Sequence, residues 1–189
     1  MASAHKKVII RRFVGDVLPG YLAVGSFVQG NSIALLDLHG HLSPIVLSDV
    51  KYISYVRDFN LHDSVNPERL TRRAFLARPR SEGLWVRVTF RTPTSASADP
   101  RSPDLLEGLA PTDTSLLDDL LNDTGLYLTP PDTRSNTQRI FIPRSAIAEL
   151  AILAVITTPS RRKPVTAPPA TSIQDDLFSL PQPPSAHPN

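Results

Sequence analysis

The stretch Val8-Ile9-Ile10-Arg11-Arg12-Phe13, followed by the turn dipeptide Gly15-Asp16, decides the fold class of this chain. Its β-branched residues suit a pleated, half-buried strand, and a glycine-aspartate pair after an apolar run is typical of a tight turn. The run Trp85-Val86-Arg87-Val88-Thr89-Phe90 has the same character and begins a second series of short apolar runs. A pattern that occurs twice indicates two copies of one small unit. We therefore expect a mainly β protein.

Each copy is predicted to contain five short strands, with one tight turn before the last strand. The later runs of the first copy are 20–22, 33–36 and 45–53, and those of the second copy are 107–109, 125–128 and 140–150. Gly30-Asn31 and Gly40 fit the tips of hairpins. The segment Leu47-Ser48-Asp49-Val50 is predicted to be the tight turn before the last strand of the first copy. Short strands joined in this way are typical of a small, strongly bent barrel.

The predicted organisation has four parts: a first small β-barrel at 1–58, a linker at 59–83, a second small β-barrel at 84–157 and a tail at 158–189. The linker is expected to contain a basic helix, because Asn66-Pro67-Glu68 has the order of a helix start. A loop insertion is expected at 92–104, where serine, alanine and proline cluster. The proline-rich tail is expected to be disordered, since it has little apolar surface to bury.

The composition limits the possible classes of function. The chain has 189 residues, a formal net charge of +2 and no cysteine, which excludes disulfides, thiolate chemistry and sulfur-ligated metals. The start of the chain, residues 1–7, does not resemble the core of a signal peptide, and no apolar run reaches the ~18–20 residues of a membrane span. We therefore expect a cytoplasmic protein without a membrane partner. A net charge this small is not by itself an argument for a nucleic-acid partner.

The strongest local charge signal is a run of arginines in the linker, with no acid between residues 69 and 80. Its members are Arg69, Arg72, Arg73, Arg78 and Arg80. On a helix, the first three would share one face. One interpretation is a ridge that contacts phosphates and binds with a strong salt dependence. The other, which we favour, is a solvated face or a face paired with the acids Asp113, Asp118, Asp119 and Asp123.

Trp85 and Arg87 form a second candidate binding surface. If Val86 and Val88 face the core, strand alternation places Trp85 and Arg87 on the opposite face. An outward tryptophan beside an arginine could stack on a nucleic-acid base. The alternative that we favour is packing of Trp85 against a neighbouring helix or the other barrel. Two further candidate binding residues near the end of the second copy are Arg139 and Arg144.

Nothing in the sequence indicates catalysis. No nucleophile has a base at an interpretable spacing, and no glycine-rich phosphate loop occurs. His39 and His41 could in principle bind a metal, but we interpret them as exposed turn residues. We therefore expect a non-enzyme with no metal and no cofactor.

The tail contains one apolar island that could recognise a partner. Its apolar residues Ile173, Leu177, Phe178 and Leu180 fit a helix that lies in a groove of another protein. The alternative is a chance apolar segment in a linker.

The order of elements resembles the Sm-like small β-barrel, in tandem. It comprises a basic helix, a strand, a Gly/Asp turn, a strand ending in glycine, two further strands, a tight turn and a last strand. The resemblance implies two five-stranded Sm-like or SH3-like barrels joined by the basic helical linker. Sm-type proteins bind RNA through two signature loops, which would correspond here to residues 112–117 and to Arg144-Ser145. The stretch 125–144 is also similar to an uncharacterised bacterial family.

A second resemblance involves the arginines. The segment 72–79, followed by Val86-Arg87-Val88-Thr89-Phe90, is similar to the start of PilZ domains, where arginines ahead of a barrel hold a cyclic dinucleotide. The partner motif of that family would correspond to residues 113–118. A guanidinium fork suits both phosphate and guanine geometry.

Three functions follow from these observations. The leading one is a non-catalytic binding or scaffold protein with a protein partner or a homo-oligomeric state. The second is binding of RNA or single-stranded nucleic acid through the arginine-rich linker. The third is PilZ-like sensing of a cyclic dinucleotide.

Overall fold

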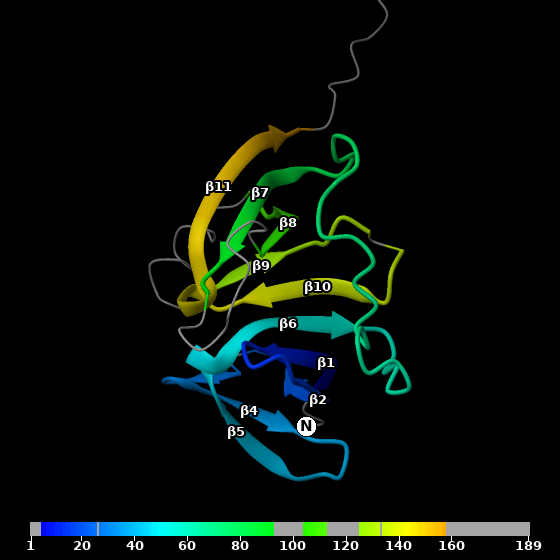
Figure 1. Ribbon diagram of the computed structural model, residues 1–189, viewed down its shortest axis with the longest axis vertical. Coiled ribbons are helices and arrows are strands. Elements are labelled where there is room, and N and C mark those ends of the chain that lie inside the picture. The colour runs from blue at the N-terminus through cyan, green and yellow to red at the C-terminus, as the bar shows by residue number, and fades with distance from the viewer. Residues whose placement is uncertain (1–4, 26, 93–103, 113–124, 133, 158–189) are drawn as a thin grey trace, which may run out of the picture. The chain divides into compact units, whose positions relative to one another are not determined.

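The computed structural model describes residues 5–25, 27–92, 104–112, 125–132 and 134–157. All of these belong to one compact unit, Met1–Thr158. The described part contains eleven strands and two short 3-10 turns (Figure 1). The strands are β1 (His5–Arg12), β2 (Val17–Ala23), β3 (Val28–Gln29), β4 (Ser32–Leu36), β5 (Leu42–Val46), β6 (Val50–Val56), β7 (Gly83–Phe90), β8 (Leu105–Ala110), β9 (Leu126–Leu128), β10 (Thr137–Ile142) and β11 (Ile147–Ile156). The turns are η1 (Leu47–Asp49) and η2 (Arg144–Ala146).

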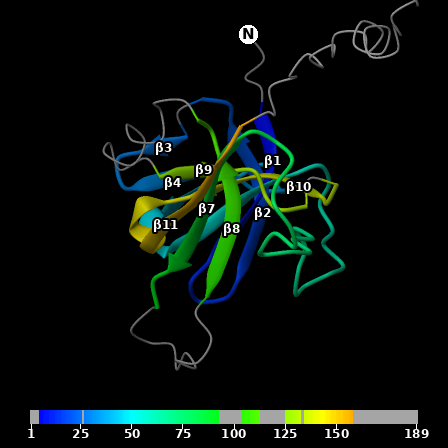
Figure 2. The same ribbon diagram turned by 90° about the horizontal axis from the view of Figure 1, so that it is seen from above.

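The strands form two antiparallel sheets, which confirms the mainly β prediction. The larger sheet has the order β3-β4-β2-β1-β6-β10-β9, with β5 paired to β4, and the smaller has the order β11-β7-β8. In Figure 1, β7, β8 and β11 lie on one side of β6 and β10, and β1, β2, β4 and β5 lie on the other. Figure 2 shows β11, β7 and β8 side by side.

The prediction of two closed barrels is wrong. Closing the first half would require β5 to pair with β6, but β6 uses one edge for β1 and the other for β10. In the second half, β10 pairs with β6 and β9, and the smaller sheet remains open. The two halves nevertheless share an order of pairing: β1 lies between β2 and β6, and β7 lies between β8 and β11. A 3-10 turn precedes the last strand of each half.

Strand β10 separates two hydrophobic cores. Side chains alternate between the faces of a strand, so consecutive residues of β10 contact different cores. Ile140 and Ile142 pack in one core with Val86 and Leu128, whereas Phe141 packs in the other with apolar residues of β1, β2 and β6. β10 therefore contributes to both cores. Because each core is small and depends on this shared strand, the halves are not independent barrels.

The predicted basic helix of the linker is also wrong, because the helix start continues for only one turn. The Arg69 N–H donates to the Asn66 carbonyl at 2.9 Å, and the Leu70 N–H donates to the Asn66 side chain at 3.0 Å, so these residues form a turn. Arg69 then adopts a positive φ of 50°, a left-handed conformation that ends a right-handed helix. Beyond this turn the backbone hydrogen-bonds to the smaller sheet, with Glu107 N–H donating to the Arg73 carbonyl at 2.7 Å.

Several predictions fall on residues that the structure does not describe. They are residues 93–103 of the insertion predicted at 92–104, the tail at 158–189 with its apolar island, and the acids Asp113, Asp118, Asp119 and Asp123. Among the described residues, no helix has the length and apolar character needed to cross a membrane.

Candidate functional site: an aromatic and basic groove beside β10

The side chains of Tyr55, Tyr127 and Arg139 lie side by side on one face of the larger sheet, next to the buried core. Arg139 on β10 lies directly opposite Tyr55 on β6, and Tyr127 on β9 lies opposite Phe141, two residues further along β10. All four residues therefore project from the same face of the sheet. Phe141 is buried, whereas Arg139 is exposed and the two tyrosines are half-buried. We call Tyr55, Tyr127 and Arg139 the aromatic-arginine site.

The site is held by ring contacts. The guanidinium carbon of Arg139 lies 3.9 Å from the centre of the Tyr127 ring, a cation–π contact. The Tyr127 ring is 5.0 Å from that of Phe141 and 6.3 Å from that of Tyr55, centre to centre. Burial, together with the neighbouring Tyr127, raises the pKa of Tyr55 above its usual value of 10.0. Its phenol is thus neutral at physiological pH and adds no negative charge.

Two hollows flank this site and share Tyr127 and Arg139 as a common wall. The first, of about 340 Å³, is lined by Lys6, Phe27 and Tyr55 and by the end of β2. The second, of about 320 Å³, is lined by Glu82, Pro111 and Thr129 among others. Volumes of this size are at the lower end of the range found for small-molecule sites.

A third hollow continues from the second one into the linker. It has a volume of about 340 Å³, shares Ser81 and Leu109 with the second hollow, and is lined by Arg72, Arg78 and Arg80. We call the three hollows together the groove. Basic side chains therefore line the groove at both ends, beside aromatic rings in its first part.

The arginine run is divided between the groove and structural contacts. Arg73 forms an ion pair with Asp104 at 2.7 Å, and Asp104 also pairs with Lys51. Arg72 lies close to Asp132, whose pKa is lowered mainly by a hydrogen bond from the Thr71 hydroxyl. Within the described residues, Arg78 and Arg80 form no ion pair, and their side chains are exposed.

Trp85 and Arg87 lie on one face of β7, and both hydrogen-bond to the buried carboxylate of Glu107. Arg87 donates to this carboxylate at 2.7 and 3.0 Å, and the Trp85 indole donates at 3.1 Å. The Phe75 N–H donates at 3.1 Å, and the Phe75 ring packs edge-on against Trp85 at 5.6 Å. Burial alone would raise the pKa of Glu107, but these hydrogen bonds hold it below its usual value. Trp85 thus contacts the linker segment, and the structure places neither residue in the groove.

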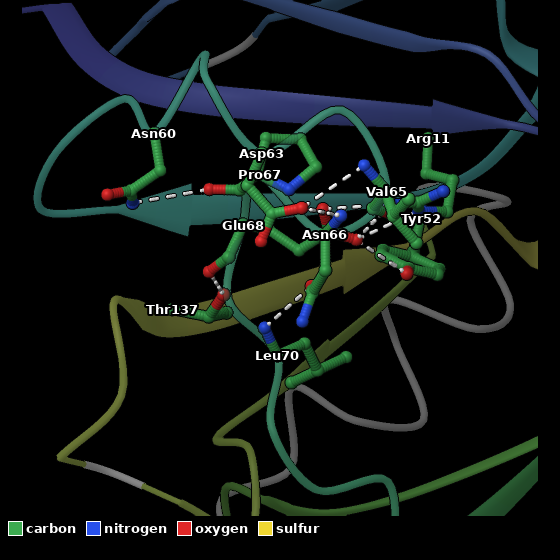
Figure 3. Close-up of polar contacts among 10 residues, drawn as sticks. All are labelled: Arg11, Tyr52, Asn60, Asp63, Val65, Asn66, Pro67, Glu68, Leu70 and Thr137. Atoms are coloured by element: carbon green, nitrogen blue, oxygen red, sulfur yellow. Dashed lines mark hydrogen bonds and ion pairs between the residues drawn. The ribbon is translucent and has the colours of Figure 1, made fainter.

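Figure 3 shows the second buried carboxylate, Glu68, which attaches the linker to the larger sheet. Arg11 donates two hydrogen bonds to its oxygens at 2.8 and 2.9 Å, and the Tyr52 hydroxyl donates a third at 3.0 Å. Thr137 on β10 donates to the Glu68 carbonyl at 2.8 Å. Burial raises the pKa of Tyr52 to about 12, so its hydroxyl remains a donor. Glu68 therefore fixes the position at which the linker leaves the sheet.

The remaining candidates lie elsewhere. Arg69 is exposed on the turn described above, and Arg144 is exposed in η2. His39 and His41 lie in the exposed turn between β4 and β5, with His41 Nδ1 3.5 Å from Asp37. The apolar residues Ile173, Leu177, Phe178 and Leu180 are outside the described residues.

Sequence reasoning selected Arg139 but missed the aromatic residues that accompany it. Tyr127 occurs in the predicted strand 125–128, and Tyr55 in the last strand of the first half. Alternation along each strand predicts which face of that strand carries the tyrosine. That the two faces adjoin depends on the β6–β10 pairing, which no local pattern predicts.

The fold and the groove define an antiparallel β protein with an exposed basic and aromatic surface. The chain belongs to a family of unknown function, DUF6982, whose model matches residues 4–154. That match covers every described strand except the last two residues of β11. The chain matched no curated protein and no solved structure.

Proposed function

We propose that this chain is a non-catalytic binding protein whose aromatic-arginine site takes a planar, anionic ligand of the nucleotide class. The observation that carries the proposal is the stacking of the exposed Arg139 on Tyr127 between two hollows. An arginine offers a planar fork that hydrogen-bonds phosphate in a bidentate manner. The guanidinium plane of Arg139, held on Tyr127, and the half-buried ring of Tyr55 both offer a flat surface to a base.

The charges around the site support an anionic ligand. Lys6 and Arg139 line the first hollow, and its described lining contains no acid. The phenol of Tyr55 is neutral, since its pKa is raised. A phosphate in this hollow would therefore meet cations and neutral donors, without a carboxylate to repel it.

Calorimetric titration with uridine and adenosine monophosphates tests this function. The wild-type protein is expected to bind at least one of them, and Arg139→Ala to bind it about 10-fold more weakly. Arg57→Ala is the matched control, because Arg57 is equally an exposed arginine but lines none of the three hollows. Equal binding by wild type and Arg139→Ala would contradict the proposal, and so would equally tight binding of inorganic phosphate, which has no base to stack.

A second candidate function is assembly with a second copy of the chain, and β11 favours it. This strand of ten residues pairs with β7 on one edge, and no described strand pairs with its other edge. Ile152, Leu153 and Val155 on it are 61%, 38% and 55% exposed. A long apolar edge strand of this kind readily pairs with another strand. Two copies of β11 could pair antiparallel about a twofold axis.

Analytical ultracentrifugation over a range of concentrations tests the assembly. The wild-type protein is expected to dimerise, and Ile152→Lys to remain monomeric at the same concentrations. Val14→Lys is the control, because Val14 is 78% exposed but lies in the turn between β1 and β2. A monomeric wild-type protein would contradict this candidate function.

We also propose an ancestry, a third candidate function and a cellular location for the chain. The shared pairing order of the two halves supports a duplicated unit with Sm-like ancestry. Cyclic-dinucleotide sensing, suggested by the resemblance to PilZ domains, is the third candidate, and Arg72 and Arg78 of the PilZ-like segment 72–79 both line the third hollow. We place the protein's action in the cytoplasm, as the sequence analysis predicts.

A further inference from the structure

We infer that the whole groove binds a single-stranded nucleic acid, with a base at the aromatic-arginine site and the following phosphates along Arg78 and Arg80. This inference rests on the proposed function, since it assigns to the same site a longer ligand. It adds the third hollow, which a single nucleotide at Tyr127 has no need to reach.

The adjacency of the three hollows is the first argument. The first and second hollows share Tyr127 and Arg139, and the second and third share Ser81 and Leu109. Each hollow exceeds 300 Å³. The three hollows thus adjoin one another, and a ligand that runs from Tyr127 to the linker arginines passes over these shared walls. Such a path suits a flexible polymer better than a compact small molecule.

The second argument comes from how the protein uses its arginines. Four arginines that hold the fold together are paired with a carboxylate: Arg11 with Glu68, Arg12 with Asp16, Arg73 with Asp104, and Arg87 with Glu107. A fifth, Arg91, donates to the Ser48 carbonyl. Arg78 and Arg80 have no such partner among the described residues, although they line the third hollow. Unpaired arginines along a groove can exchange counterions for phosphates, the main source of nucleic-acid affinity.

The third argument selects a single strand over a duplex. Tyr127 and Tyr55 are half-buried and flank recessed hollows. Bases in a duplex are stacked on one another and do not present their faces to a protein. Unpaired bases can leave the stack and lie on aromatic rings, beside a positively charged path for the backbone.

The described lining contains one acid, Glu82, in the second hollow. Its carboxylate lies on the path between the aromatic-arginine site and the linker arginines, and it is exposed. A single charge there weakens the attraction for phosphates but does not reverse it, because five cations line the three hollows. They are Lys6, Arg72, Arg78, Arg80 and Arg139.

Fluorescence anisotropy with a labelled oligouridylate of about ten nucleotides, within the range that single-strand sites cover, tests the inference. The intact chain is expected to bind the oligonucleotide much more tightly than uridine monophosphate and more tightly than a duplex of equal length. The double variant Arg78→Ala/Arg80→Ala is expected to lower oligonucleotide affinity by about 10-fold. The slope of log affinity against log salt concentration should become shallower by about 1.4, because two phosphate contacts to a single strand are lost. The affinity of the double variant for uridine monophosphate is expected to be unchanged.

The control is Arg57→Ala/Arg134→Ala, which removes the same charge from exposed positions outside the three hollows. If both double variants lose affinity equally, or if the duplex binds as tightly as the single strand, the inference is overturned. If uridine monophosphate binds but the oligonucleotide binds no more tightly, the inference fails while the proposed function stands. If neither ligand binds, both fail. An acidic protein retained by the wild type, with no binding of the oligonucleotide, would likewise overturn the nucleic-acid assignment.

Discussion

The guanidinium carbon of Arg139 lies 3.9 Å above the ring of Tyr127, and the two residues come from adjacent strands of a sheet that both halves of the chain share. Arg139 is exposed although it follows the buried Thr137 by only two positions on the same strand. The sheet thus carries a buried core at its centre and an accessible ring-and-guanidinium pair at its margin. This arrangement is the basis of the binding function proposed above.

The ring of Tyr127 and its hydroxyl are expected to contribute differently to binding. Tyr127→Phe keeps the stacking surface, so its nucleotide affinity should remain within about 2-fold of the wild type. Tyr127→Leu keeps packing volume against Phe141 but removes the aromatic face, and base stacking is worth about 1–3 kcal/mol. Calorimetry should therefore show at least about 5-fold weaker binding for Tyr127→Leu. Equal affinities for the two variants would argue against stacking at this position.

The Glu68 carboxylate is expected to be the largest single polar contribution to stability near the linker. Glu68→Ala leaves the half-buried Arg11 guanidinium without a carboxylate and should cost about 3 kcal/mol. Glu149→Ala is a suitable comparison, because Glu149 is exposed on β11 and has no described ion pair. Its effect should stay within about 0.5 kcal/mol. Urea denaturation measures both variants, and similar losses in the two would contradict the role given to Glu68.

Glu107 is expected to make the protein sensitive to acid. Its pKa in the folded chain lies below its usual value of 4.5, so its stabilising contribution is complete above that value. The contribution is lost as the pH falls through the folded-state pKa. The difference in unfolding free energy between wild type and Glu107→Gln should therefore be largest near neutral pH and shrink in acid.

The fluorescence of Trp85 reports this transition directly. Trp85 is the only tryptophan of the chain, and its indole N–H donates to Glu107 at 3.1 Å. Urea titrations followed by this emission at several pH values give the required free energies. A difference that stays constant between about pH 3 and pH 7 would mean that Glu107 does not titrate with folding.

Gly125, immediately before β9, is expected to be required for the position of Tyr127. Its φ is +101°, and a Cβ there would lie 2.4 Å from the Ile142 carbonyl oxygen and 2.8 Å from the Phe141 ring. Gly125→Ala should therefore destabilise the protein by several kcal/mol, because backbone strain and overpacking each cost about 1–3 kcal/mol.

Gly30→Ala is the control for this prediction. Its φ is also positive, at +59°, but a Cβ there would meet no atom within 4 Å. Gly30→Ala should therefore lower the free energy of unfolding by only about 1 kcal/mol, the cost of the left-handed backbone conformation for a residue with a Cβ. Thermal unfolding of the two variants separates the contributions, and equal losses would show that the contact with Phe141 and Ile142 is unimportant.

The sequence predicted local features well because they depend on local chemistry. Gly15-Asp16, Gly30-Asn31 and Gly40 lie in the turns between strands, and residues 47–49 form the predicted tight turn before β6. Long-range pairing was not predictable in the same way. The pattern of β6 is compatible with any antiparallel partner, and its choice of β10 depends on the burial of Phe141 in the first core.

The linker shows how tertiary contacts override a local signal. Asn66-Pro67 begins a single turn and not the predicted helix, because Glu68 is buried and hydrogen-bonds to Arg11 and Tyr52. An acid expected near the positive end of a helix is therefore the centre of a buried network. Of the candidate site residues, Arg139 could be selected from the sequence, whereas its ring partner could not, because the pair forms only when β9 and β10 align.

Photocrosslinking tests the central claim most directly. An oligouridylate containing 4-thiouridine would be irradiated in complex with the intact chain, and the crosslinked peptide identified by mass spectrometry. A base that stacks at the aromatic-arginine site should attach to the peptide containing Tyr127 or to that containing Tyr55, and Arg139→Ala should reduce the yield. Crosslinks that map to other peptides and are unaffected by Arg139→Ala would contradict the assignment of the ligand to this groove.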